Sequence, residues 1–536
     1  MRLRPIRRRF ASLLPAALFA LPLFASCAPA PAESWWRHVR WLADDARQGR
    51  QTGSPGYLAA AQYVAHEFEM AGARPAGTAG WFQPASFVAR RVVEPECSVV
   101  LSRRDRADTL DLGEDALLSA SLDAADSIDA PAVFVGHGLE LPESGLRDLD
   151  GLDLRGAVAV YLRGAPRDVP STVAAHAQST GERWARLRER GAIGLVTISN
   201  PKVRSLPWER ARLTRLEEGF TLADSSLDEK GGMRFALYAN PDRAERFFQG
   251  SGHTFAEILQ RADANQPLPR FALPYRIRAR VRLTRRAVES PNVVGVIPGS
   301  DPVLRGESIV LSAHLDHLGI GAPIAGDSIY NGAMDNASGV ATLIEIARAL
   351  RSGSPPRRSI VLLAVTGEEE GLLGSRVFAA HPPAAVGRMV ADLNLDMFLP
   401  IAPLRSVIAY GADESDLGDW FRAAAESSSV KVEPDPEPAQ NIFVRSDQYS
   451  LVRAGVPSLF VEIGPGGDSA VVRRFQLWRK NRYHAPSDDT RQPIDFRAAD
   501  DFNRLLLRFT RDVADRPARP RWKPSSFFRR YEPGPS

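Results

Sequence analysis

The stretch from Ile309 to Leu350 constrains the fold most, because polar residues there follow a buried strand and precede a buried helix. It begins IVLSAHLDHLG, continues to YNGAMDNASG and ends VATLIEIARAL. The apolar run 309–311 is typical of a strand buried on both faces. His314, Asp316 and Asp335 stand at the ends of these elements, where they are costly to hold unless a cation joins them. Taken alone, the stretch fits a metal site and a solvated polar loop equally well.

The length of 536 residues exceeds what one hydrophobic core usually supports, so we expect two domains. The formal charge of +4 is small for this length and indicates no nucleic-acid partner. Cys27 and Cys97 are the only cysteines. This excludes a disulfide framework and a cysteine-based zinc site.

Residues 1–33 are typical of a signal peptide, with a basic segment MRLRPIRRRF followed by the apolar segment ASLLPAALFALPLFAS. The apolar segment is short and interrupted by proline, which disfavours a membrane span. We therefore expect an exported protein. The sequence FASC resembles a lipoprotein signal that would leave Cys27 lipidated, as a periplasmic membrane anchor. Cleavage near Ala30 or Ala32 would instead release a soluble, secreted or periplasmic protein, and both outcomes stay open.

The rest of the chain divides into segments that differ in their pattern of apolar, polar and turn residues. Residues 34–96 hold a helical pattern, and from 97 to 285 short β-rich runs alternate with turn residues. From 286 to 515 strand-like runs alternate with helical patterns, which predicts an α/β fold with a mostly parallel sheet. Residues 516–536 form a packed or frayed tail. The accessory region 97–285 shows no catalytic spacing, and we expect its scattered histidines to be structural; these are His137, His176 and His253.

Three further polar motifs follow predicted strands of the last region. SIVLLAVT precedes a run with Glu368 and Glu369, MVADLNLD ends at Asp396, and VPSLFVEI leads to Tyr483 and His484. In open α/β sheets the functional crevice lies outside the carboxyl ends of the strands. We therefore expect these side chains to converge with those of the first stretch.

Two histidines and three carboxylates supply ligands suited to zinc. Two metals about 3.5–4 Å apart need a bridging carboxylate. Glu368 and Glu369 offer one ligand and one free base, and alternation near a strand end should point them to opposite sides. Asp316 is placed to accept the second imidazole N–H of His314. A lone glutamate run is usually a solvated cluster, but that interpretation leaves the other motifs unexplained.

The ordered motifs HLDHLG, NGAMDNASG, TGEEEGLLGS, NLDM and YHAPSDD resemble the co-catalytic zinc exopeptidase family of bacterial leucyl aminopeptidases, aminopeptidase Y and glutamate carboxypeptidase. This resemblance implies a three-layer α/β/α catalytic domain, with 97–285 as an inserted, β-rich protease-associated domain. It also implies two Zn²⁺ per chain and a peptide substrate. The implied ligands are His314 and Asp396 for one zinc, Glu369 and His484 for the other, and Asp335 as the bridge.

By the same resemblance, Glu368 is the general base, Asp316 orients His314, and Tyr483 stabilises the oxyanion. Gln448 departs from the pattern, since many members have histidine there. The predicted function is an exported zinc aminopeptidase. A carboxypeptidase or amide-cyclising enzyme on the same scaffold and a non-catalytic binding protein are the alternatives. Side-chain preference and oligomeric state stay open.

Overall fold

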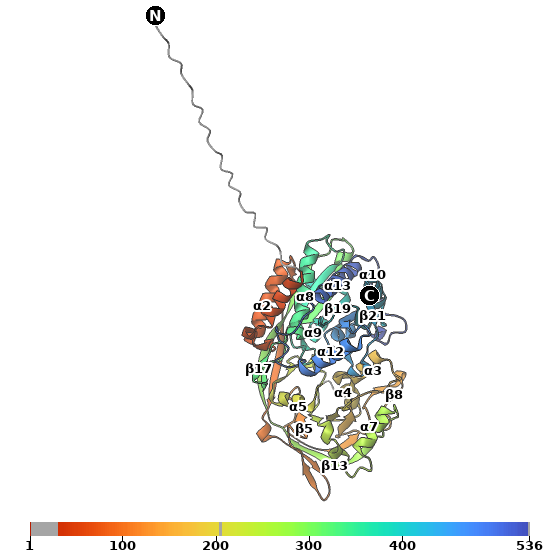
Figure 1. The fold of residues 1–536 in the computed structure, drawn as a ribbon. Coiled ribbons are helices and arrows are strands. Elements are labelled where there is room, and N and C mark those ends of the chain that lie inside the picture. Colours follow the sequence, from red (N-terminus) through yellow and green to blue (C-terminus); the bar gives the residue numbers. More distant parts are fainter. Residues whose placement is uncertain (2–30, 203–205, 534–536) are drawn as a thin grey trace.

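The computed structural model describes residues 1, 31–202 and 206–533. It has two parts, each built around its own sheet (Figure 1). Most of the predicted signal segment 1–33, Cys27 included, lies outside the described residues, and α1 (Pro31–Leu42) begins within its end. None of the described helices combines the length and apolarity needed to cross a membrane.

The larger part has a sheet of ten strands among the described residues, in the order β11-β2-β14-β18-β15-β19-β22-β20-β21, with β1 beside β14. The four central strands β18, β15, β19 and β22 are parallel, as predicted. Antiparallel pairings add β14 on one side and β20 on the other, so the sheet is mixed rather than mostly parallel. The strands are β1 (Arg74–Pro75), β2 (Phe82–Val92), β11 (Gly219–Leu222), β14 (Leu283–Ile297), β15 (Glu307–His314), β18 (Ser359–Val365), β19 (Arg388–Asn394), β20 (Ser406–Tyr410), β21 (Lys431–Glu433) and β22 (Ser458–Gly464).

Helices cover both faces of this sheet, because successive side chains of a strand point to opposite faces. Ile309 and Leu311 join a core with α1, α2, α8, α10 and α13, whereas Val310 packs with Phe378 of α9 and Leu451 of α11. The predicted three-layer α/β/α arrangement is therefore confirmed. The helices are α2 (Pro55–Met70), α8 (Ser338–Arg351), α9 (Leu373–Ala380), α10 (Asp416–Ser427), α11 (Gln448–Arg453), α12 (Ser469–Asn481) and α13 (Phe496–Asp515).

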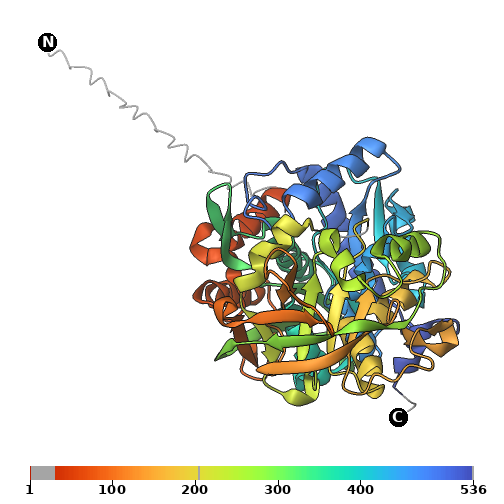
Figure 2. The same cartoon turned by 90° about the horizontal axis from the view of Figure 1, so that it is seen from below.

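Among the described residues, the smaller part has a sheet of eight strands, a separate pair β7 (Glu140–Leu141) and β8 (Leu146–Arg147), and its own hydrophobic core. Figure 2 views this part from below. Its strands are, in order across the sheet, β4 (Ala107–Thr109), β3 (Ser98–Ser102), β13 (Phe271–Arg280), β6 (Ser127–Phe134), β9 (Val158–Leu162), β10 (Gly194–Ile198), β12 (Phe235–Ala239) and β5 (Ala116–Leu118). Its helices are α3 (Ser171–Gln178), α4 (Thr180–Glu189), α5 (Trp208–Ala211), α6 (Glu245–Phe248) and α7 (Phe255–Asp263). All of them lie within the predicted region 97–285, whose likeness to a protease-associated domain stays a prediction.

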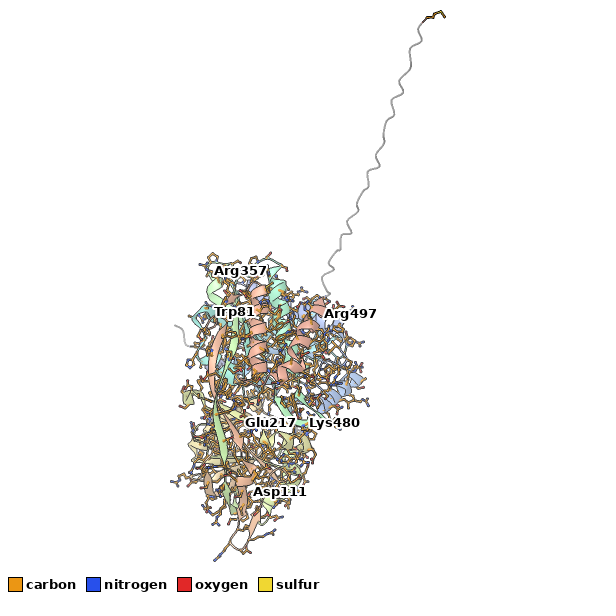
Figure 3. All side chains as sticks on the ribbon, turned by 90° about the vertical axis from the view of Figure 1, so that its left-hand side faces the viewer. Trp81, Asp111, Glu217, Arg357, Lys480 and Arg497 are labelled. Carbon is orange, nitrogen blue, oxygen red and sulfur yellow. The ribbon has the colours of Figure 1, made fainter. Side chains whose placement is uncertain are left out.

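The two parts are joined by paired strands rather than by a simple linker. β2 and β14 pair along the whole of β2, from Phe82–Val293 to Val92–Leu283. β11, although it lies within 97–285, pairs with β2 in the larger sheet. Figure 3 places the labelled Glu217 and Lys480 at the level where the parts meet, with Trp81 and Arg357 above and Asp111 below.

The predicted tail is packed over its described residues, 516–533. Trp522 and Phe528 are buried in a cluster with Tyr449 and Phe443 of the larger part. Glu414 accepts hydrogen bonds both from Ser526 of the tail and from Thr172 of α3. The tail therefore helps to fasten the smaller part to the larger one.

Candidate metal centre

The predicted ligands meet at the carboxyl ends of the central parallel strands. His314 is the last residue of β15, Glu369 follows β18, and Asp396 lies two residues after β19. Asp335 lies three residues before α8, in the short π-helical segment Ala333–Ala337, and His484 lies in the loop after α12. Because neighbouring parallel strands end at one edge of a sheet, residues far apart in sequence come together here.

Their donor atoms form two groups that share Asp335. His314 Nε2 lies 3.2 Å from Asp335 Oδ1 and 3.2 Å from Asp396 Oδ1. His484 Nε2 lies 3.3 Å from Asp335 Oδ2 and 3.2 Å from Glu369 Oε2. Ligand atoms about 2.0–2.1 Å from a tetrahedral zinc lie about 3.3 Å from one another. The spacing therefore fits two cations bridged by Asp335.

The state of Asp335 also fits a cation site. Its Oδ2 atom is buried and has no hydrogen-bond partner among the described residues, although His484 Nε2 is close. Burial raises the pKa of Asp335, but His317, His314 and His484 outweigh it and hold this pKa well below its usual value. Asp335 is thus an ionised carboxylate with an unused buried oxygen, and a shared metal would satisfy it.

Glu368 and Glu369 differ in surroundings. The predicted reason, alternation at a strand end, is wrong, because β18 ends at Val365 and both residues lie in a turn after Gly367, whose φ is +69°. Glu368 lines the cavity at the site, and burial together with Glu369 holds the pKa of Glu368 well above its usual value. Burial also raises the pKa of Glu369, but His484 and His317 together outweigh it and lower this pKa to about 2.

Asp316 contacts the site differently from the prediction. His314 Nδ1 lies 3.1 Å from the main-chain oxygen of Asp316, not from its carboxylate. That carboxylate instead accepts the backbone N–H groups of Glu368 and Glu369, at 3.2 and 3.3 Å, and the hydroxyl of Thr52. The chain bends after β15, so the carbonyl reaches the imidazole and the carboxylate reaches the glutamate turn. Asp316 therefore positions both elements.

Sequence reasoning missed His317, the second histidine of HLDHLG. Its Nδ1 lies 2.6 Å from Glu369 Oε1 and 3.9 Å from Asp335 Oδ2, and the three residues form a further set of potential ligands. It also missed Ser446, which donates to Asp396 Oδ2 at 2.8 Å. Asp488 of YHAPSDD accepts the backbone N–H of Asp335 at 3.0 Å. The only indication of His317 and Asp488 in the sequence was that they lie within the motifs HLDHLG and YHAPSDD.

Arg50 lies fully buried beneath the site. Burial lowers the pKa of Arg50 to about 10, and the carboxylates of Asp488 and Asp316 oppose this. Its guanidinium donates to three main-chain oxygens that lie near His314 or Asp335 in sequence, those of Leu315 at 2.9 Å, Asn331 at 2.7 Å and Gly332 at 2.9 Å. It also donates to the main-chain oxygen of Leu42 at 2.8 Å. Arg50 therefore ties two ligand loops together.

The loop of Tyr483 and His484 is held from both parts of the molecule. Arg445 of the larger part donates to the Tyr483 hydroxyl at 3.1 Å. Arg210 of α5, in the smaller part, donates to the main-chain oxygens of Lys480, at 2.8 Å, of His484, at 2.7 Å, and of Tyr483. The accessory region thus touches the site through an arginine that the sequence did not single out.

The three scattered histidines make other contacts. His137 contacts the Leu162 carbonyl at 2.9 Å, His253 contacts Glu257, and His176 contacts the hydroxyl of Tyr449 in the larger part at 2.7 Å. Gln448 is buried and bonds to Asn394 at 2.9 Å.

Two cavities open from the site. One of about 350 Å³ is lined by Asp335, Asp396 and residues of β22 and α12. The other, of about 820 Å³, lies between the two parts. Five residues line both: Glu368, Glu369, Arg445, Tyr483 and His484.

Comparison with known proteins places the chain among peptidases. A family model described as Peptidase family M28 matches residues 292–510. A "Probable leucine aminopeptidase" of Arthroderma otae is 28% identical over 232 residues, which cover 42% of this chain and 58% of that protein. A "Vacuolar membrane protease" of Tuber melanosporum is 28% identical over 211 residues, 38% of this chain and 19% of that protein. The chain thus spans less than two thirds of the length of these curated relatives.

Among solved structures, an aminopeptidase from Aneurinibacillus sp. strain AM-1 has the same fold. The TM-score is 0.53 at 18% identity, and the match covers 91% of this chain and 95% of that one. The family match spans the motifs of His314, Asp335, Glu369, Asp396 and His484. On this evidence, residues 292–510, which carry these motifs, are similar to peptidase family M28.

Proposed function

We propose that the protein is an aminopeptidase that removes N-terminal residues from peptides with the help of two zinc ions. The observation that carries the proposal is the pair of ligand groups joined by Asp335, with donor atoms 3.2–3.3 Å apart. Similarity to proteins named as aminopeptidases supports the substrate class. His314 and Asp396 would hold one zinc, and Glu369 and His484 the other.

Bound zinc supplies Lewis acidity, which makes water a stronger acid and polarises a carbonyl. Glu368 lines the cavity and makes no ligand-type contact of its own, so it takes the proton of the attacking water and later gives it to the leaving amine. Its raised pKa suits a group that must hold a proton during the reaction. The Tyr483 hydroxyl, which accepts from Arg445, is free to donate to the developing oxyanion.

The sizes of the two cavities favour cleavage at a chain end. The cavity of about 350 Å³ is at the small end of the range for ligand pockets, about 300–1,000 Å³. It suits the terminal residue, while the cavity of about 820 Å³ between the parts suits the rest of the peptide. In this proposal the smaller part resembles a protease-associated domain and shapes access to the site.

The test is an assay of the purified protein on aminoacyl and C-terminal peptide substrates, with metal analysis before and after chelation. We expect hydrolysis of aminoacyl substrates, two equivalents of zinc, and loss of activity on chelation that zinc reverses. Asp335→Asn should lower the content of both metals. Cleavage of C-terminal residues alone, or one tight equivalent of metal that is insensitive to Asp335→Asn, would overturn the proposal.

We also propose that the protein is exported. The support is the basic and apolar segment within residues 1–33, which lies largely outside the described residues. Mass spectrometry of the native N-terminus tests this. A diacylglyceryl-modified Cys27 would mean anchoring, a start shortly after Cys27 would mean release, and an intact Met1 on the active protein would refute export.

A further inference from the structure

The cavity of about 350 Å³ contains a buried carboxylate that has no part in the proposed reaction. Glu462 lies on β22 and is 9% exposed. It lines the same cavity as Glu368, Asp396 and His484. Burying a carboxylate in a partly apolar cavity costs free energy unless a partner offsets it, so its partners need to be identified.

Only one oxygen of Glu462 has partners among the described residues. The Tyr410 hydroxyl donates to Oε2 at 3.2 Å, and Arg479 Nη2 lies 3.6 Å from the same atom. Arg479 is shared, because its other nitrogen donates to Glu437. Oε1 has no hydrogen-bond partner in the described part of the chain. Burial raises the pKa of Glu462 to about 7, and Arg479 opposes this shift. The negative charge of the carboxylate is therefore only partly offset by its neighbours.

The rest of the cavity suits a long side chain. Met397, Ile442 and Phe460 give it apolar lining, and Glu462 lines the same cavity. Among the other charged groups near Glu462, Arg445 donates to the Tyr483 hydroxyl and Lys480 is exposed, while Asp396 and Asp435 add negative charge.

We propose that this cavity binds the side chain of the N-terminal residue of the substrate, and that Glu462 selects a cationic side chain, lysine or arginine. The inference rests on the proposed aminopeptidase function and names its substrate class. The aliphatic stem of such a residue packs against Met397, Ile442 and Phe460. Its cationic head donates to Glu462 Oε1 and completes the pairing of that carboxylate.

The test is the kcat/KM of the purified protein on p-nitroanilides of lysine, arginine and leucine. We expect the wild type to prefer lysine and arginine. Glu462→Gln should lower kcat/KM for these two substrates by about 10- to 100-fold, because this is the contribution of a hydrogen bond to a charged group. The kcat/KM for the leucine substrate should change little. Glu462→Leu should raise kcat/KM for the leucine substrate relative to that for the lysine substrate.

Glu437→Gln is the matched control, because it removes a carboxylate from the same cavity that is 38% exposed. We expect a much smaller change in its lysine preference than for Glu462→Gln. The inference is wrong if the wild type prefers leucine and Glu462→Gln leaves that order unchanged. It is also wrong if Glu462→Gln lowers kcat/KM for all three substrates equally, because Glu462 would then bind the α-amine or stabilise the fold.

A binding measurement separates this inference from the proposed function. Calorimetric titration of the zinc-loaded protein with free L-lysine and L-leucine needs no turnover. Tighter binding of lysine that is lost in Glu462→Gln supports the pocket even if no aminoacyl substrate is cleaved. Equal binding of both amino acids by an active enzyme refutes the pocket and leaves the aminopeptidase proposal standing.

Discussion

At the residue scale, two adjacent glutamates have different contacts. Glu369 Oε2 lies 3.2 Å from His484 Nε2, whereas Glu368 lines the cavities without such a contact. Glu368→Gln should therefore lower turnover by at least about 10²–10⁴-fold, because it removes a general base, while metal content stays near that of the wild type. Glu369→Gln should lower metal content, and excess zinc should restore part of the activity.

Turnover measured beside metal analysis of both variants checks this prediction. The two variants serve as controls for each other, since each makes the same chemical change one position apart. If Glu368→Gln lost its metal while Glu369→Gln kept it, the two roles would be reversed.

The buried guanidinium of Arg50 gives a second prediction at this scale. Arg50→Met would leave four main-chain oxygens without their donor. We expect the free energy of unfolding to fall by about 3–5 kcal/mol, as when a partner of a buried charged group is removed. Denaturant unfolding measures it, with Arg155→Met, whose side chain is 84% exposed, as the control that should behave like the wild type. An unchanged midpoint of denaturant unfolding for Arg50→Met would contradict this stabilising role of Arg50.

At the scale of elements, the short helix α5 of the smaller part holds a loop of the larger part. Arg210 donates to the main-chain oxygens of Tyr483 and His484. Arg210→Met should release this loop, and kcat/KM should fall by up to about 10²-fold, the loss expected when a reacting group is misplaced by about 1 Å.

Zinc affinity should fall together with activity, because the same loop carries the proposed ligand His484. Arg212→Met is the matched control: Arg212 lies two residues away but pairs with Glu114 and Glu209 instead. The prediction fails if the two variants lose the same amount of activity and zinc affinity.

At the scale of the whole molecule, the two parts share structure rather than only a linker. β2 and β14 pair along eleven positions, and β11 returns from the smaller part to the larger sheet. His176 of α3 also contacts Tyr449 of α11. Unfolding either part would therefore disrupt the other.

We expect the protein to unfold in one cooperative transition, with the calorimetric enthalpy equal to the van't Hoff enthalpy. Scanning calorimetry checks this with and without chelator. If zinc binds the folded protein as proposed, chelation should lower Tm for the whole transition. Two separate transitions, of which chelation shifts only one, would show that the parts fold independently.

The central layers and the meeting of the candidate ligands followed from local patterns. Apolar runs such as 309–311 and 359–365 predicted the buried strands, and their polar successors predicted the site, because parallel strands end at one edge. The antiparallel flanks were not predictable, since pairing partners such as β11 and β2 lie far apart in sequence. The contact of Asp316 was mispredicted, because spacing does not say whether the carbonyl or the carboxylate faces His314.

Local patterns were enough to identify the candidate residues for the chemistry: the histidines and carboxylates, their order along the chain, and the buried strands that bring them to one edge. These depend on local periodicity and side-chain type. Which atoms face one another became clear from the packing of the layers in three dimensions. It showed that Arg50 and Arg210 hold the ligand loops and that Glu462 lies in the cavity beside the ligands. Such contacts join segments hundreds of residues apart, and they are set by how the layers pack rather than by any local pattern.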